Sequence, residues 1–481
     1  MYRYTTDTKI LKKEIRMSNF WDFSVWSWMM IFAILLGSLL VGNILKRKIP
    51  FLTNSLIPTS VLAGGLLLIV SSVYRAITGE VMFDSGVFGD QGTETLEIIT
   101  YHTLALGFIA SAFKTTNTKL TKKRTSEILN TGVTTVSTYL IQAIFGLGIT
   151  MIAAVVMSGF FPAAGVLLPF GFGQGTGQAL NYGNLYETDY GFVGGRSFGL
   201  TIAAFGFLSA SIGGVIHLNV MRKRGRLVLS KRTDGSLHSE EVESPNEMPM
   251  QESIDKFTVQ IALIMVAYIA SYGLMYLLGQ LLPGMRSVIY GFNFLLGVLT
   301  GTLIKLLMNF FYKKGISRKK YTNNFLMTRA SNFFFDIMVV SGIAAIRLDI
   351  LEKYWGIMII LGVAGAIVTY VYNRVVAKTL FDDYCEEQFL AMYGMLTGTA
   401  STGVILLREI DGEFRTPASD NLVYQNFPAI VLGFPMLLLA DLAPQKPVLT
   451  LIIFVLFFIC TNILLFRSKI FKKRRRISKE T

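Results

Sequence analysis

A series of apolar stretches, each about 20 residues long, runs through the sequence and limits what the chain can fold into. A stretch of this length is what an α-helix needs to cross the hydrocarbon core of a bilayer. The composition agrees, because 52% of the residues are hydrophobic and only 16% are charged, whereas soluble chains average roughly 25% charged residues. We therefore expect an all-α integral membrane protein and exclude a large soluble helical protein.

Eleven helices are predicted to cross the membrane. Their expected ranges are 20–44, 57–76, 96–113, 127–158, 196–220, 257–281, 288–311, 324–346, 354–377, 419–441 and 447–466. Two further apolar segments, at 160–182 and 388–407, are interrupted by glycine and threonine. We expect these two segments to be re-entrant hairpins, which enter the membrane without crossing it.

Lysine and arginine determine the expected orientation, because cytoplasmic loops are enriched in both. The basic loops are 46–48, 114–124, 222–226, 313–320 and 472–476, whereas the alternate loops at 79–97 and 186–191 contain neither residue. The N-terminus is therefore expected outside and the C-terminus in the cytoplasm, in a plasma-membrane protein. Lys9, Lys12, Lys13 and Arg16 oppose this orientation, and a start at Met17 would remove the conflict. Because the net charge of +14 falls largely in these loops, the bilayer accounts for it and nucleic acid is not an expected partner.

The predicted order of segments indicates an internal repeat. A polar tail (1–19) precedes a first membrane unit (20–220), and a solvated cytoplasmic linker (221–256) leads to a second unit (257–441). In each unit a hairpin follows the fourth helix. Because the first unit starts outside and the second inside, we expect two inverted five-helix repeats, as in secondary transporters. An extra transmembrane helix (447–466) and a basic cytoplasmic tail (467–481) follow.

The two hairpins are the predicted substrate site. Non-helical backbone persists at membrane depth only where protein or a wet cavity satisfies its polar groups, and glycine allows the backbone to approach a ligand closely. Packing of helices through small residues is the alternative. The candidate substrate-binding residues are Gly173, Gln174, Gly175, Thr176, Gly177, Gly398, Thr399, Ser401, Thr402 and Arg408. Arg408 could hold a carboxylate bidentately or extend to the membrane interface.

The first hairpin, "FGQGTGQALNYGNLYETDYGF" (172–192), and the following "AAFGFLSASIGG" (203–214) resemble the bacterial sodium/glutamate symporter family. "SLIPTSVLAGGLLL" (55–68) and "LLLAD", which ends at Asp441, are similar to two further motifs of that family. The resemblance implies inverted repeats, a homodimer, and sodium-coupled uptake of glutamate by alternating access. It also makes Asp441 a candidate coupling residue. Gln174 stands where the family has histidine, which bears on the substrate.

Asp336, in the middle of "SNFFFDIMVVSG" (331–342), is the main candidate for ion coupling. A carboxylate inside a membrane span is costly and usually faces the interior of the bundle. Ser331 and Asn332 could add neutral oxygen ligands. A structural pairing of Asp336 with Arg329 or Asn332 is the alternative.

The remaining chemistry points away from an enzyme. The two cysteines and three histidines are scattered, so no zinc site or other resident cofactor is expected, and the motifs of metalloproteases and nucleotide-binding loops are absent from the sequence. The expected partners are sodium, a small glutamate-like anion and the lipid bilayer. A channel, or a carboxylate transporter coupled to protons, is the alternative function.

Overall fold

The computed structural model describes residues 19–54, 56–114, 121–224, 247, 254–317, 319–411, 415–467 and 469. In this part of the chain the regular structure is helical, apart from one isolated bridge between Glu247 and Lys320. The predicted all-α class is therefore confirmed. The N-terminal tail to residue 18, most of the expected linker (225–246 and 248–253) and the basic tail from residue 470 lie outside the described residues.

The first half contains α1 (Phe23–Lys48), α2 (Pro50–Asn54), α3 (Thr59–Thr78), α4 (Gly92–Phe113), α5 (Lys122–Val156), α6 (Leu167–Thr188) and α7 (Gly195–Lys223). The second half contains α9 (Lys256–Leu281), α10 (Arg286–Gly291), α11 (Asn293–Lys313), α12 (Asn324–Ala344), α13 (Trp355–Leu380), α14 (Cys385–Thr397), α15 (Ala400–Arg408), α16 (Ala418–Tyr424) and α17 (Asn426–Leu442). The last described helix is α18 (Pro447–Leu465). A 3-10 helix, η3 (Pro162–Val166), precedes α6.

Nine helices in the described ranges are long and apolar enough to cross a bilayer. The pair α16 and α17, which is bent by 51°, makes a tenth if it forms one span. The remaining predicted span is α12, which has the necessary length but contains Arg329 and Asp336 among its 21 residues. The helices fit a multi-pass membrane protein.

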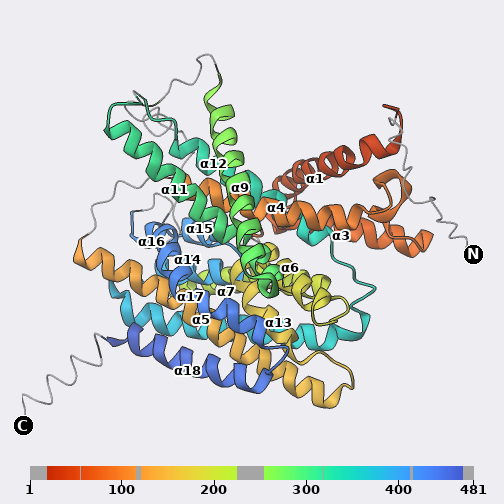
Figure 1. Ribbon diagram of the computed structural model, residues 1–481. Coiled ribbons are helices and arrows are strands. Elements are labelled where there is room, and N and C mark those ends of the chain that lie inside the picture. The colour runs from red at the N-terminus through yellow and green to blue at the C-terminus, as the bar shows by residue number, and fades with distance from the viewer. Residues whose placement is uncertain are drawn as a thin grey trace, which may run out of the picture.

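The described helices pack in two groups, seen as the upper and lower parts of Figure 1. In the upper group α3, α4, α11 and α12 form the centre, and α1 and α9 flank it. Hydroxyl pairs join α4 to α12, Thr100 to Ser341 at 2.9 Å and Ser111 to Ser331 at 2.8 Å, so these two helices run antiparallel. The lower group contains α5, α7, α13, α17 and α18, with α6, α14 and α15 packed among them.

Close backbone contact joins η3, which leads into α6, to α5. A Cβ atom added at Gly165 would lie 1.8 Å from the carbonyl oxygen of Gly146, and one added at Gly146 would lie 2.1 Å from the carbonyl oxygen of Gly165. The hydroxyl of Thr150 also accepts a hydrogen bond from the Gly165 N–H at 3.0 Å. Only glycine at both positions permits this approach, because backbone atoms cannot move aside as the end of a side chain can.

We expect Gly146→Ala to lower the thermal unfolding temperature of the purified protein in detergent, because the new methyl group collides with the backbone at Gly165. A cost of about 1–3 kcal/mol is typical of overpacking. Gly148→Ala on the same helix is the matched control, since a Cβ atom at Gly148 meets nothing within 4 Å. Equal unfolding temperatures for the two variants would contradict this account of the contact.

Candidate functional site

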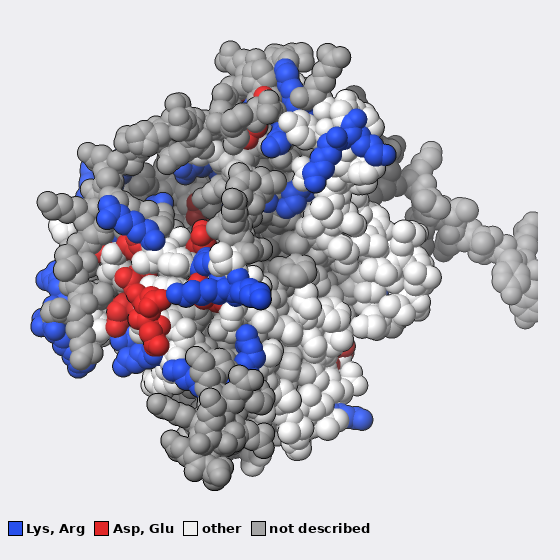
Figure 2. Space-filling model, turned by 90° about the vertical axis from the view of Figure 1, so that its left-hand side faces the viewer, with Lys and Arg blue, Asp and Glu red and all other residues white. Residues whose placement is uncertain are grey.

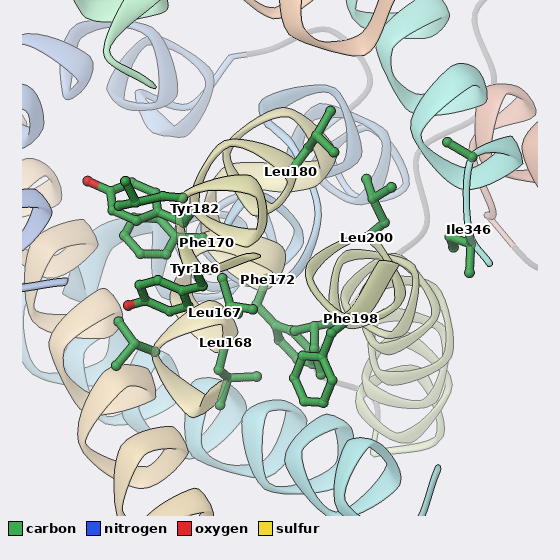
Figure 3. Close-up of a cluster of buried hydrophobic side chains, with 14 of the residues drawn as sticks. Leu167, Leu168, Phe170, Phe172, Leu180, Tyr182, Tyr186, Phe198, Leu200 and Ile346 are labelled. Atoms are coloured by element: carbon green, nitrogen blue, oxygen red, sulfur yellow. The ribbon is translucent and has the colours of Figure 1, made fainter. Parts of the chain in front are cut away.

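The first glycine-rich segment turns back on itself at Gly175. This residue has φ 78° and ψ −172° inside α6, a conformation that interrupts the helix. The rings of Phe170 and Tyr182 stack across the interruption with centroids 3.9 Å apart (Figure 3). In a continuous helix these residues would be separated by about 18 Å along the axis. The chain therefore reverses, and α6 consists of two antiparallel arms.

The second segment reverses between α14 and α15, at Gly398 and Thr399. A Cβ atom added at Gly394 would lie 2.8 Å from the Cα atom of Gly403, so the two helices touch through their glycines. The hydroxyl of Thr399 caps α15 by accepting a hydrogen bond from the backbone N–H of Thr402 at 3.4 Å. Both segments singled out in the sequence thus form two-armed turns.

The two turns meet beside α12. A Cβ atom added at Gly175 would lie 3.5 Å from Cγ2 of Thr399, 3.8 Å from the carbonyl oxygen of Gly398 and 4.0 Å from Cε of Met338. The hydroxyl of Thr176 donates to the carbonyl oxygen of Met338 at 3.3 Å. We call this contact of Gly175, Thr176, Gly398, Thr399 and Met338 the tip junction.

The hairpins approach the tip junction from opposite ends of α5. The first begins beside the C-terminal part of that helix, where Thr150 donates to the carbonyl oxygen of Pro162 at 2.7 Å. The second begins beside its N-terminal end, where Lys123 pairs with Asp383 at 2.9 Å. In the middle of α5, Tyr139 donates to the carbonyl oxygen of Gly173 at 3.1 Å. Gln142 follows one turn later and donates to the carbonyl oxygen of Leu396 at 3.0 Å. The junction therefore lies near the midpoint of α5.

Four helix ends converge at the tip junction. The first arm of α6 and the helix α14 end there, whereas the second arm of α6 and the helix α15 begin there. Helix N-termini carry partial positive charge and C-termini partial negative charge. The side chains nearest to Gly175 and Gly398 are those of Thr399, Met338, Thr402 and Phe207, all of which are uncharged. The junction therefore presents backbone donors and acceptors among neutral side chains.

The glycines of the first hairpin have different neighbours in the structure. A Cβ atom at Gly173 would lie 2.1 Å from the ring of Tyr139, and one at Gly177 would lie 2.7 Å from Leu104. These two glycines pack against helices, which fits the alternative that small residues serve helix packing; substrate binding by them stays a prediction. Gly175 faces the junction, and Gln174 beside it is half-buried. Thr402 is buried at the start of α15, whereas the side chain of Ser401 lies outside the described residues.

Two predicted site residues lie away from the junction. Arg408 is the last residue of α15 and is exposed. Nine residues separate it from Thr399, which corresponds to about 13 Å along a helix. Asp441 lies at the end of α17, where its carboxylate accepts a hydrogen bond from the hydroxyl of Tyr190 at 2.9 Å, beyond the open end of the first hairpin. Both residues therefore lie away from the tips, and carboxylate binding by Arg408 and coupling by Asp441 stay predictions.

The predicted coupling residues on α12 have different surroundings. Ser331 is buried and donates to the carbonyl oxygen of Gly107 at 3.0 Å, so it joins α12 to α4. Asn332 is exposed. Asp336 is also accessible, and its carboxylate interacts with the hydroxyl of Ser60 on α3, a residue of the other half of the chain. Asp336 precedes Met338 of the tip junction by two positions, so the two residues lie at nearly the same level of α12, but their side chains leave the helix on roughly opposite sides.

Sequence reasoning missed Gln178, which is three residues after Gly175. Its side chain is 1% exposed, and neither its amide nitrogen nor its amide oxygen has a partner among the described residues. The amide oxygen of Gln142 is likewise buried without a partner in the described part of the chain. The sequence did contain a signal for this residue, because an amide side chain is unusual within an apolar segment interrupted by glycines.

Charged side chains hold the two open ends of the hairpins. Near the first, Arg347 bonds Asp349 at 3.0 Å and Asp84 at 3.4 Å, beside a polar hollow of about 270 Å³. Near the second, Glu386 bonds Arg374 at 2.6 Å and the buried His217 at 3.0 Å. Figure 2 shows the face where α5 begins, with Lys and Arg side chains around a group of Asp and Glu side chains. Charge is thus concentrated at the ends of the bundle.

No family model matches the chain, and no curated protein matches it. The geometry of the tip junction is therefore what bears on function.

The ion pairs of Asp349 lead to a prediction about pH. Burial alone would raise the pKa of Asp349, but hydrogen bonds and charge from Arg347 and Arg75 lower it to about 2. A depressed carboxyl pKa stabilises the fold above the ordinary value of 3.8 and loses this contribution as the pH falls toward 2. We expect Asp349→Asn to lower the unfolding temperature by the same amount at pH 5 and pH 7. A difference that fades at pH 5 would contradict the assignment.

Proposed function

We propose that this protein is a secondary active transporter that carries a small organic anion of the glutamate class together with sodium, by alternating access. The tip junction carries the proposal. Secondary transporters bind substrate near the bilayer midplane, between broken helices of inverted repeats. Two hairpins that approach from opposite ends of α5 and touch near its midpoint are the arrangement such a site requires.

Paired contacts support the inverted repeats. In the first half α1 packs on α3, and in the second half α9 packs on α11. Across the halves α3 packs on α12, and α11 packs on α4. These contacts match if α1 corresponds to α9, α3 to α11 and α4 to α12. In each half a hairpin also follows a long helix, α5 in the first half and α13 in the second. The proposal also includes hairpins that enter the membrane without crossing it and an extra membrane-spanning helix, α18. It further includes a homodimer, which the resemblance to sodium/glutamate symporters implies.

The electrostatics of the junction suit both substrates of a symporter. The helix N-termini at Thr176 and Ala400 offer N–H groups to a carboxylate, and the helix C-termini before Gly175 and Gly398 offer carbonyl groups to a sodium ion. We assign Asp336 to coupling, because it is an acidic residue of α12, the helix that contributes Met338 to the tip junction. Since α12 belongs to the upper helix group and the tips to the lower group, relative movement of the groups would open the junction to one side at a time.

The orientation follows from charge. Lys123 at the start of α5, Arg374 near the end of α13 and Arg467 just after α18 all lie at one end of the bundle. Basic residues favour the cytoplasmic side of a membrane. We therefore assign the linker and the C-terminus to the cytoplasm and the N-terminus to the outside of a plasma membrane.

Uptake into proteoliposomes tests the function. With the purified full chain and an inward sodium gradient, labelled L-glutamate should accumulate above its external concentration, saturate, and leak out when an ionophore collapses the gradient. Uptake that only equilibrates would indicate a channel. Accumulation driven by a proton gradient without sodium would indicate proton coupling.

The coupling role of Asp336 makes a separate prediction. Asp336→Asn removes the negative charge but keeps the size of the side chain, so we expect the sodium concentration for half-maximal uptake to rise by about tenfold, as for loss of one charged contact. Asp441→Asn is the matched control, because Asp441 lies at the end of α17, and it should leave sodium dependence unchanged. A folded Asp336→Asn protein with normal sodium dependence would refute the assignment.

A further inference from the structure

Gln178 is a buried amide that the fold itself does not use. Both of its polar atoms lack partners among the described residues, although its side chain is 1% exposed. The buried Gln388, by contrast, is bonded through both groups: it donates to Thr131 at 3.3 Å and accepts from Asn421 at 2.9 Å. Leaving a buried donor and acceptor unpaired destabilises a protein, so the position of Gln178 calls for a ligand.

Gln178 lies close to the tip junction along the chain. Gln178 is the third residue after the turn at Gly175, in the first turn of the returning arm. Side chains of an α-helix lean toward its N-terminus, which for this arm is the junction. The first N–H groups of a helix also have no partner within the helix. An amide donor, an amide acceptor and free backbone N–H groups therefore occur together at this point.

The charge distribution limits which substrate fits. One carboxylate can be held by the first-turn N–H groups and the Gln178 amide nitrogen. An ammonium group can donate to the Gln178 amide oxygen and to a carbonyl such as that of Gly398, which borders Gly175. The atoms nearest to an added Cβ at Gly175 and Gly398 belong to Thr399, Met338, Thr402, Phe207 and the backbone, and none of them carries a positive charge for a second carboxylate.

We propose that Gln178 contacts the substrate and that the tip junction binds an α-amino acid through its carboxylate and ammonium groups. A negatively charged side chain on the substrate is then not required, so neutral amino acids bind as glutamate does. This inference rests on the proposed transport function and narrows its substrate from an organic anion to a zwitterion.

A panel of three ligands tests the class of substrate. Calorimetric titration of the purified full chain in detergent with sodium would use L-glutamine, L-glutamate and glutarate, which lacks the ammonium group. We expect the Kd values of the two amino acids to agree within about threefold, and glutarate to bind at least about tenfold more weakly, as for loss of one charge-assisted contact. Glutarate binding as well as glutamate, or failure of glutamine to bind, would overturn the proposal.

Substitution tests the residue. Gln178→Met keeps the length of the side chain and removes both hydrogen-bonding atoms, so the Kd of either amino acid should rise by about tenfold or more. The ligand-free variant should unfold at the same or a higher temperature, because an unpaired buried amide is gone. Gln388→Met is the matched control, with a lower unfolding temperature and an unchanged Kd. If Gln178→Met does not fold, Gln178→Ala replaces it.

The failures of the two proposals can be told apart. An unchanged Kd in folded Gln178→Met or Gln178→Ala protein, with sodium-driven uptake intact in the wild type, would overturn the role of Gln178 alone. Absence of sodium-driven uptake of any of the three ligands by the wild type would overturn the proposed transport function, and the inference with it.

Discussion

Backbone groups exposed where a helix turns back inside a membrane bundle must find partners there, and the rest of the structure depends on this constraint. Two side chains of α5 provide part of the answer. Tyr139 donates to the carbonyl oxygen of Gly173 and Gln142 donates to that of Leu396, so one helix supports both hairpins just before their turns. Small residues let the helices come close enough: a Cβ atom at Gly206 of α7 would lie 2.5 Å from the carbonyl oxygen of Thr397.

The placement of charge complements this support. Ion pairs such as Arg347 with Asp349 and Arg374 with Glu386 hold the open ends of the hairpins, whereas the nearest side chains to the tips are neutral. A ligand at the tips would therefore meet helix dipoles and amide groups rather than fixed charges. Such groups can hold a small ion without the desolvation cost of a buried charge, and in the proposed transport cycle they would release it when the hairpins separate from α12.

Much of the fold could be predicted from the sequence, because membrane spans depend on local apolarity and hairpin turns on local glycine. Interruption of the two segments at 160–182 and 388–407 was predicted for this reason. Which face each glycine presents was not predictable, since Gly173 and Gly177 differ from Gly175 only in contacts with the distant Tyr139 and Leu104. The partner of Asp336 was missed for a similar reason, because Ser60 lies in the other half of the chain. The distance of Arg408 from the tips follows from the length of α15, which extends from Ala400 to Arg408.

Accessibility of the junction from both sides is the central claim, and a single cysteine measures it. In a background where Cys385 and Cys460 are replaced by serine, Thr399→Cys would be exposed to a membrane-impermeant thiol reagent from outside or from inside proteoliposomes. Alternating access predicts labelling from either side, and protection from both when sodium and L-glutamate are present. Labelling from one side only, or labelling that sodium and L-glutamate leave unchanged, would contradict the account.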